Sequence, residues 1–118
     1  MITGIGTDLV SIKRIKEIFY SHGERFVKRI LTGSEVEKYS SKSEVEKINY
    51  LAKRFAAKEA ISKALGTGIG NLSFHDIEIK NLNSGKPTVH VKKFENLRIH
   101  LSISDEKDFA LAFAIAEK

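Results

Sequence analysis

The chain has 118 residues, of which 42% are hydrophobic and 30% are charged, a composition typical of one soluble globular domain. It contains no cysteine, which excludes disulfides and thiolate chemistry, and it shows neither an apolar run of membrane-spanning length nor a signal segment. We therefore expect a single cytoplasmic domain over residues 1–118, whose net charge of +5 favours polyanionic partners: nucleic acid, phosphorylated small molecules or an acidic protein.

The first predicted element is a strand from Met1 to Val10. Its two-residue period puts Gly4, Gly6 and Asp8 on one face. Glycine inside a strand often marks the close approach of another backbone or of a ligand. Asp8, at the end of this strand, is either a residue of a metal or phosphate site or the cap of the next helix. The segment alone leaves both interpretations open.

Two helical segments follow, and both are rich in basic residues. Apolar residues recur at helical spacing from Ile12 to Phe19, His22 and Gly23 interrupt the pattern, and a shorter piece runs from Glu24 to Ile30. A solvated surface is the ordinary fate of such charges, and a docking patch for an acidic partner is the alternative. The six basic residues are Lys13, Arg14, Lys16, Arg25, Lys28 and Arg29.

A short helix is predicted over Glu35 to Tyr39 and a long one from about Glu44 to Leu65, each preceded by a capping-box pattern. In the long helix, an apolar stripe continues into Glu59 and Lys63, while Lys58 points elsewhere. A Glu and a Lys four residues apart are commonly an exposed ion pair worth about 0.2 to 0.5 kcal/mol. Because this pair interrupts a face that ought to be buried, it also fits the wall of a cleft.

After Gly66 the pattern changes to strands, predicted at 74–80, 88–93, 97–104 and 109–116. The last of these is apolar on both faces, so we expect it to be central or covered on both sides. Its alternating alanines would let a helix pack closely. The fold class is therefore α+β: an N-terminal strand, a helical middle with one long helix, and a C-terminal antiparallel β-meander.

The chemistry depends on whether Asp8 and Glu59 converge. Two carboxylates, completed by water and a substrate phosphate, are the usual way in which proteins hold Mg²⁺. Lys63, one turn from Glu59, would stabilise the charge that develops on a departing group. This combination predicts phosphoryl transfer or diphosphate cleavage.

Two segments carry a family resemblance: Gly6–Ile15 contains G-x-D, and Arg54–Ala64 contains F-x-x-K-E-A-x-x-K. Together they resemble the holo-[acyl-carrier-protein] synthase family of small 4′-phosphopantetheinyl transferases. The likeness extends over nearly the whole chain, through Arg25-Phe26, Leu31-Thr32, Gly66–Gly70, Ser73-Phe74, Asp76–Ile79, Gly85–Pro87 and Leu101–Ser104.

The resemblance implies transfer of the phosphopantetheine arm of coenzyme A to a serine of apo acyl carrier protein, releasing adenosine 3′,5′-bisphosphate and supporting fatty acid biosynthesis. It implies that Asp8 and Glu59 hold Mg²⁺ on the coenzyme diphosphate and that Lys63 steadies the leaving phosphate. Glu59, or a metal-bound water, would take the serine proton. The small members of the family are similar in being homotrimers with sites between subunits.

The resemblance also assigns residues outside this centre. Those matching the coenzyme pocket, besides Lys63, are Arg54, Gly66, Lys86, Pro87 and Ser104; those expected to receive the acidic carrier protein are Arg14, Arg25 and Lys28. One position departs from the pattern, because Asp105 stands where the family commonly has histidine. An added negative charge near a diphosphate should weaken binding, so Asp105 is expected either to contact the water shell of the metal or to turn outward.

Two other functions remain as alternatives. A nucleic-acid binding module would use the basic residues between Lys13 and Arg29, and its affinity would fall steeply with salt. The scarcity of aromatics on the expected exposed strand face argues against this module. A different Mg²⁺-dependent enzyme acting on a nucleotide diphosphate is the other alternative.

Overall fold

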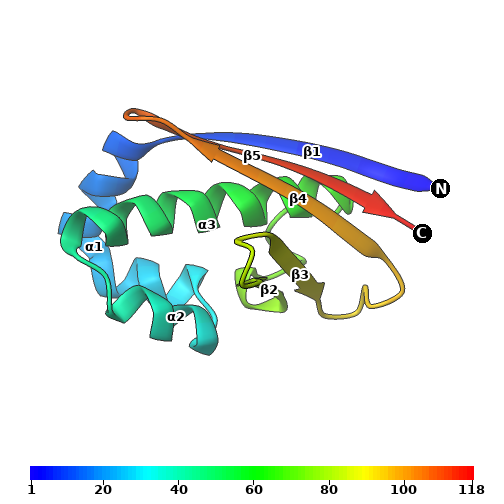
Figure 1. The fold of residues 1–118 in the computed structure, drawn as a ribbon, viewed down its shortest axis with the longest axis horizontal. Coiled ribbons are helices and arrows are strands. Elements are labelled where there is room, and N and C mark those ends of the chain that lie inside the picture. The colour runs from blue at the N-terminus through cyan, green and yellow to red at the C-terminus, as the bar shows by residue number, and fades with distance from the viewer.

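The computed structural model describes residues 1–118 and is built on a three-stranded antiparallel sheet. The strand order is β1-β5-β4, formed by Ile2–Ser11, Phe109–Glu117 and Arg98–Asp105. The long helix α3, Glu44–Ala64, runs along one face of this sheet, as Figure 1 shows. The α+β architecture predicted from the sequence is confirmed.

Small side chains hold α3 close to the sheet. The inward residues of β5 are alanines with no exposed surface, and β1 contributes glycines to the same layer. Without bulky side chains between them, the backbones of helix and sheet approach closely. The predicted packing of a helix on this alanine face is thus confirmed; the alanines are Ala110, Ala112, Ala114 and Ala116.

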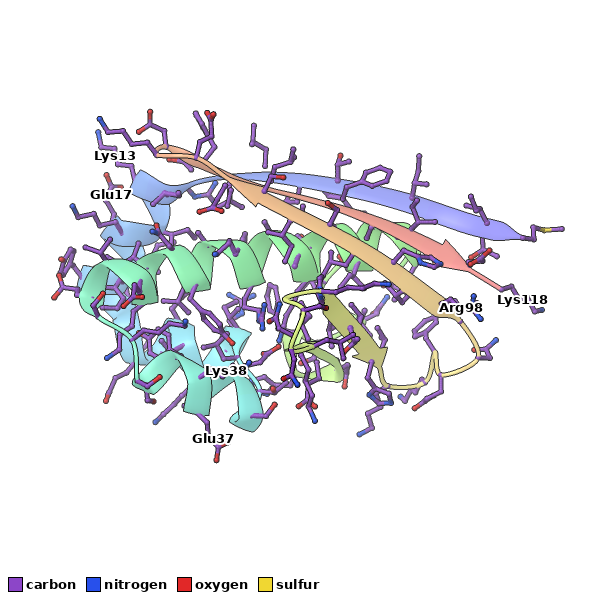
Figure 2. The ribbon with its side chains drawn as sticks, in the orientation of Figure 1. Lys13, Glu17, Glu37, Lys38, Arg98 and Lys118 are labelled. Carbon is purple, nitrogen blue, oxygen red and sulfur yellow. The ribbon has the colours of Figure 1, made fainter.

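Two further helices lie on the other side of α3. Helix α1, Ile12–Ile30, consists of two helical pieces that meet at a kink at His22, whose φ and ψ of −143° and 34° are not helical. The break predicted at this position is confirmed. Helix α2, Gly33–Ser40, begins with the predicted capping box between Thr32 and Glu35. Charged side chains such as Lys13, Glu17 and Glu37 extend outward from these helices (Figure 2).

Strands β2, Ile77–Asn81, and β3, Pro87–Val91, form a separate two-stranded sheet. The prediction that the first of these strands begins at residue 74 was wrong, because 74–76 form a 3₁₀ turn, η1, capped by Ser73. The four C-terminal strands are antiparallel, as expected, and they are divided into two hairpins that belong to different sheets.

The outer face of the larger sheet carries apolar side chains that nothing in this chain covers. Strand β5 is central, as predicted, yet Phe109, Leu111 and Phe113 are 49%, 44% and 39% exposed. Ile5 and Leu9 on β1 add to this outer sheet face, at 64% and 62% exposed. No helix of the fold combines the length and the apolar composition needed to cross a lipid bilayer.

Candidate active site

Asp8 reaches α3 because the glycines before it let β1 lie against the helix backbone. A Cβ on Gly4 would overlap the carbonyl oxygen of Ala64, and one on Gly6 would overlap that of Ala60. The same Cβ on Gly6 would lie 2.9 Å from the Cβ of Lys63. The close approach predicted from these glycines is therefore to the backbone of α3, and it places Asp8, two residues further on the same face, beside the last turns of that helix.

Lys63 is paired with Asp8 and forms no ion pair with Glu59. Its Nζ lies 3.2 Å from Asp8 Oδ1 and donates a hydrogen bond of 2.9 Å to the Thr7 carbonyl. The second carboxylate oxygen, Asp8 Oδ2, is buried and has no hydrogen-bond partner. The interpretation of Glu59 and Lys63 as an ordinary helix ion pair is therefore wrong. The interpretation of Asp8 as the cap of the next helix is wrong too, because the N-cap of α1 is Ser11.

Glu59 is half-buried, and its side chain makes no hydrogen bond or ion pair. Burial raises the pKa of this carboxyl, and the neighbouring carboxylate of Asp8 raises it further, while Lys63 and Arg29 oppose the shift. The two carboxylates are therefore close enough to repel each other. Like charges held together in a partly buried place are a feature of functional sites.

This donor set fits a magnesium ion. It offers two carboxylates, one of which has an unpartnered buried oxygen, and it has no third acidic or imidazole ligand beside them. Mg²⁺ is commonly held by one or two carboxylates, with the remaining positions filled by water and by substrate phosphate. The site therefore lacks a complete protein cage and leaves room for a phosphorylated substrate.

Beside Glu59 lies a groove of about 400 Å³ between α1 and α3, which we call the α1 groove. Its lining combines apolar side chains with three arginines and one acid, Glu59, so it suits a partner with an apolar and acidic face. Two of the three residues predicted to dock the carrier protein, Arg14 and Arg25, line it together with Glu59, whereas Lys28 faces a different groove beside α2. The other lining residues include Ile18, Phe26, Arg29 and Phe55.

The residues predicted to bind the coenzyme lie elsewhere. Arg54 and Pro87 line a cavity of about 330 Å³, which we call the Arg54 cavity. Lys86 lines a different cavity with Pro87, and Gly66 and Ser104 line none of the four main cavities. None of these four cavities contains both Glu59 and a residue of the predicted coenzyme set. Lys63 and Gly66 nevertheless lie near the carboxylates, because Lys63 is paired with Asp8 and its carbonyl accepts a hydrogen bond of 3.0 Å from the Gly66 N–H.

Sequence reasoning missed several basic residues and one buried ion pair. Three lysines, Lys38, Lys42 and Lys53, line the Arg54 cavity, and Asp105 lines it too, exposed at the end of β4. The helical pattern placed Lys58 away from the apolar stripe, yet this side chain is completely buried against Glu35. The Thr32 and Glu35 capping box was visible in the sequence, but nothing in it signals that the glutamate is also buried.

Comparisons with known proteins identify the family of this chain. The family model described as the 4′-phosphopantetheinyl transferase superfamily matches residues 4–114. A holo-[acyl-carrier-protein] synthase of Geobacillus sp. (strain WCH70) is 49% identical over 119 residues, covering 100% of this chain and 98% of that protein.

Solved structures show the same fold. Holo-[acyl-carrier-protein] synthase from Neisseria meningitidis superposes with a TM-score of 0.90 at 46% identity, covering 100% of both chains. A synthase from Bacillus anthracis str. Ames, solved in complex with CoA (3′,5′-ADP), has a TM-score of 0.91 at 41% identity, covering 100% of this chain and 98% of that one. The chain therefore belongs to the 4′-phosphopantetheinyl transferase superfamily, as an enzyme of the holo-[acyl-carrier-protein] synthase family.

Proposed function

We propose that this enzyme transfers the 4′-phosphopantetheine group of coenzyme A to a serine of apo acyl carrier protein, with Mg²⁺, and releases adenosine 3′,5′-bisphosphate in support of fatty acid biosynthesis. The observation that carries the proposal is the meeting of Asp8, Lys63 and Glu59 next to a basic and apolar groove. The coenzyme complex of the Bacillus anthracis relative supports the choice of donor.

Asp8 and Glu59 are the residues that would hold the magnesium ion. Asp8 Oδ1 is paired with Lys63, but its Oδ2 is buried without a partner, and the raised pKa of Glu59 indicates a carboxylate that is short of compensating positive charge. When bound, the ion supplies positive charge to the diphosphate and to the transition state of its cleavage.

In the reaction, the serine oxygen forms a bond to the phosphorus that carries the pantetheine arm. The bond from that phosphorus to the bridging diphosphate oxygen breaks, and adenosine 3′,5′-bisphosphate leaves. Glu59 is the proposed acceptor of the serine proton, because it is the carboxylate of the pair that has no ion-pair partner of its own, whereas Asp8 is paired with Lys63. Lys63, whose side chain is 50% exposed and therefore accessible to substrate, stabilises the negative charge on the leaving phosphate.

Recognition of the two substrates uses separate surfaces. The α1 groove receives the carrier protein, with Arg14 and Arg25 on its rim and Lys28 on the adjacent surface pairing with acidic side chains. The Arg54 cavity receives an anionic part of the coenzyme, because its arginine and three lysines outnumber its one acid, Asp105. Gly66, Lys86, Pro87 and Ser104 complete the coenzyme pocket.

We further propose that the active form is a homotrimer with its sites between subunits. The exposed apolar outer face of the β1-β5-β4 sheet offers a surface for association. A neighbouring copy would also bring a coenzyme cavity up to the carboxylate pair, which one chain does not do.

The test of this function is direct. The protein is incubated with coenzyme A, Mg²⁺ and an apo acyl carrier protein, and the carrier is weighed by mass spectrometry. The expected result is the mass gain of one phosphopantetheine group, abolished by EDTA and restored by Mg²⁺. A carrier of unchanged mass, with a folded enzyme and a carrier that another transferase can modify, would contradict the proposal.

A further inference from the structure

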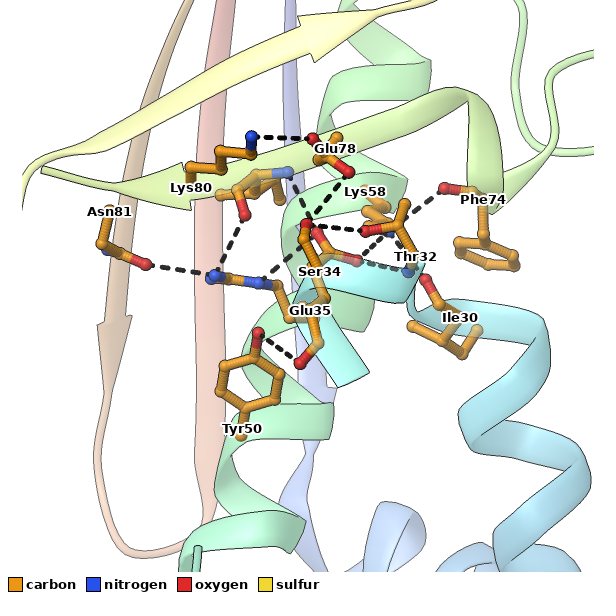
Figure 3. Close-up of polar contacts among 12 residues, drawn as sticks. Ile30, Thr32, Ser34, Glu35, Tyr50, Lys58, Phe74, Glu78, Lys80 and Asn81 are labelled. Atoms are coloured by element: carbon orange, nitrogen blue, oxygen red, sulfur yellow. Dashed lines mark hydrogen bonds and ion pairs between the residues drawn. The ribbon is translucent and has the colours of Figure 1, made fainter. Parts of the chain in front are cut away.

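A single buried carboxylate lies between two buried cations under the Arg54 cavity. Glu35, Lys58 and Arg54 are 1%, 0% and 4% exposed. Figure 3 shows Glu35 close to Lys58, Thr32 and Tyr50. Two cations and one anion leave this cluster with one uncompensated positive charge, which is unusual for groups removed from water.

The carboxylate of Glu35 is committed to Lys58. Lys58 Nζ donates to Glu35 Oε1 at 2.7 Å and to the carbonyls of Ile30 and Phe74 at 2.7 Å and 3.1 Å, so all three of its protons are used. Glu35 also accepts hydrogen bonds from the backbone N–H groups of Thr32 and Ile79, at 2.9 Å and 3.0 Å. Its acceptor sites are therefore nearly filled without Arg54.

Arg54 interacts much more weakly with the carboxylate of Glu35. Its Nε lies 3.7 Å from Glu35 Oε2, which is too far for a hydrogen bond, and this nitrogen is buried without a partner. Nη2 donates to the Ile79 carbonyl and to the Asn81 side-chain oxygen, and Nη1 has no hydrogen-bond partner. Asp105 lines the same cavity but forms no ion pair with the arginine. Arg54 is thus a nearly buried guanidinium that lines a basic cavity; its one ion pair is the long contact with Glu35 at 3.7 Å, shared with Lys58, and its Cζ lies 4.7 Å from the centre of the Tyr50 ring.

We infer that Lys58 is a positioning residue that keeps Arg54 available for the anionic coenzyme by occupying Glu35. Glu35 is already the ion-pair partner of Arg54, at 3.7 Å. If Lys58 were absent, the carboxylate could close onto the arginine, because an arginine and a carboxylate readily form a bidentate pair. Such a pair would neutralise Arg54 and turn it from the cavity. This inference rests on the proposed function, in which the cavity binds coenzyme A.

The sharpest test is a rescue, because charge balance and structural damage predict opposite outcomes. Wild type has a cluster charge of +1, Lys58→Met reduces it to 0, and Lys58→Met combined with Glu35→Gln returns it to +1 on Arg54 alone. Coenzyme A binding is measured for all three by titration calorimetry. We expect Lys58→Met to bind about tenfold more weakly and the double variant to recover to within about threefold of wild type.

The single variant Glu35→Gln is not the informative one. Burial lowers the pKa of Lys58, and Glu35 is the main group that opposes this shift. Removing Glu35 alone would therefore favour loss of the Lys58 proton, and the net charge of the cluster would no longer be known. The matched control is Lys47→Met, which removes one charge from the same helix at a site over the ring of Tyr39, 5.3 Å away, without touching Glu35. Its coenzyme affinity should equal that of wild type.

Every outcome of this experiment either supports or overturns the inference about Lys58. A double variant that binds no better than Lys58→Met would overturn the inference, as would a Lys58→Met protein that binds as tightly as wild type. If Lys58→Met fails to fold, the double variant is compared with wild type alone, and a tenfold loss of affinity overturns the proposal. The KM for the carrier protein should not change, because Arg14 and Arg25 lie in a different groove. A folded wild type that binds no coenzyme A would instead contradict the proposed function.

Discussion

At the scale of single residues, the half-buried carboxylate of Glu59 costs folding stability at the place where the proposed metal would bind. Asp8 has Lys63 as a cationic partner, whereas Glu59 is half-buried and has none. Two like charges in such a place destabilise the protein until a cation lies between them. This electrostatic repulsion is therefore located where the proposed metal ion would relieve it.

Glu59→Gln should stabilise the metal-free protein at neutral pH while reducing transfer by about 100-fold or more. The pKa of Glu59 is raised above its ordinary 4.5, so protonation of the folded state contributes stability below that value, and this contribution is lost as pH rises through the folded pKa. Glutamine mimics the protonated form at every pH. Its advantage in Tm without Mg²⁺ should therefore be present at pH 7 and vanish near about pH 4.

The check is thermal unfolding of both proteins at the two pH values in EDTA. A Tm difference of equal size at both would mean that Glu59 ionisation is not its origin.

Lys63→Met should separate catalysis from stability. The Lys63 side chain is 50% exposed, and an ion pair at such a surface contributes about 0 to 1 kcal/mol. Loss of its charge at the leaving phosphate should lower kcat by about 100-fold. Single-turnover transfer assays measure the fall in rate, and denaturant unfolding measures the change in stability. A large fall in stability with unchanged kcat would show that Lys63 has a structural role instead.

At the scale of elements, the contact between β1 and α3 is what creates the site. Gly6 lies against the backbone of Ala60 and Ala64, where only a residue without a side chain fits. Gly6→Ala should therefore push β1 off the helix and destabilise the protein by about 2 kcal/mol or more. Gly33→Ala is the control, because a Cβ there meets nothing within 4 Å. Denaturant unfolding should leave the control near wild type, and equal losses in both would show that glycine conformation, and not crowding, is responsible.

Helix α3 also shows how far sequence reasoning reaches. Its start at the Ser43 capping box and its end before Gly66 were predictable, because capping signals are local. The burial of Lys58 was not predictable, because helical periodicity treats every lysine as polar and solvated. The partners that make its burial possible, Ile30, Glu35 and Phe74, come from three other segments of the chain. For the same reason, the pairing of Lys63 with Asp8 could be seen only once β1 was placed on the helix.

At the scale of the whole molecule, one chain divides the residues of the proposed site among separate cavities. Glu59 lines the α1 groove, and Arg54, Lys86 and Pro87 line two other cavities. In the proposed trimer, a second copy would attach at the apolar outer face of the sheet, where Leu111 and Phe113 are exposed. Association would therefore bury this face and complete the site in one step.

Shared sites predict complementation between two inactive proteins. Asp8→Asn removes a proposed metal ligand and Arg54→Met removes the proposed coenzyme contact, so each assembly alone should be inactive. After subunit exchange in an equal mixture, about one interface in four would combine an intact carboxylate pair from one subunit with an intact Arg54 from its neighbour. Activity should then recover to about a quarter of wild type. Introducing Phe113→Glu into both proteins is the control, because a charge on the outer sheet face should prevent association and with it the recovery. A mixture of the two variants that remains inactive after verified subunit exchange would mean that each chain carries its own complete site.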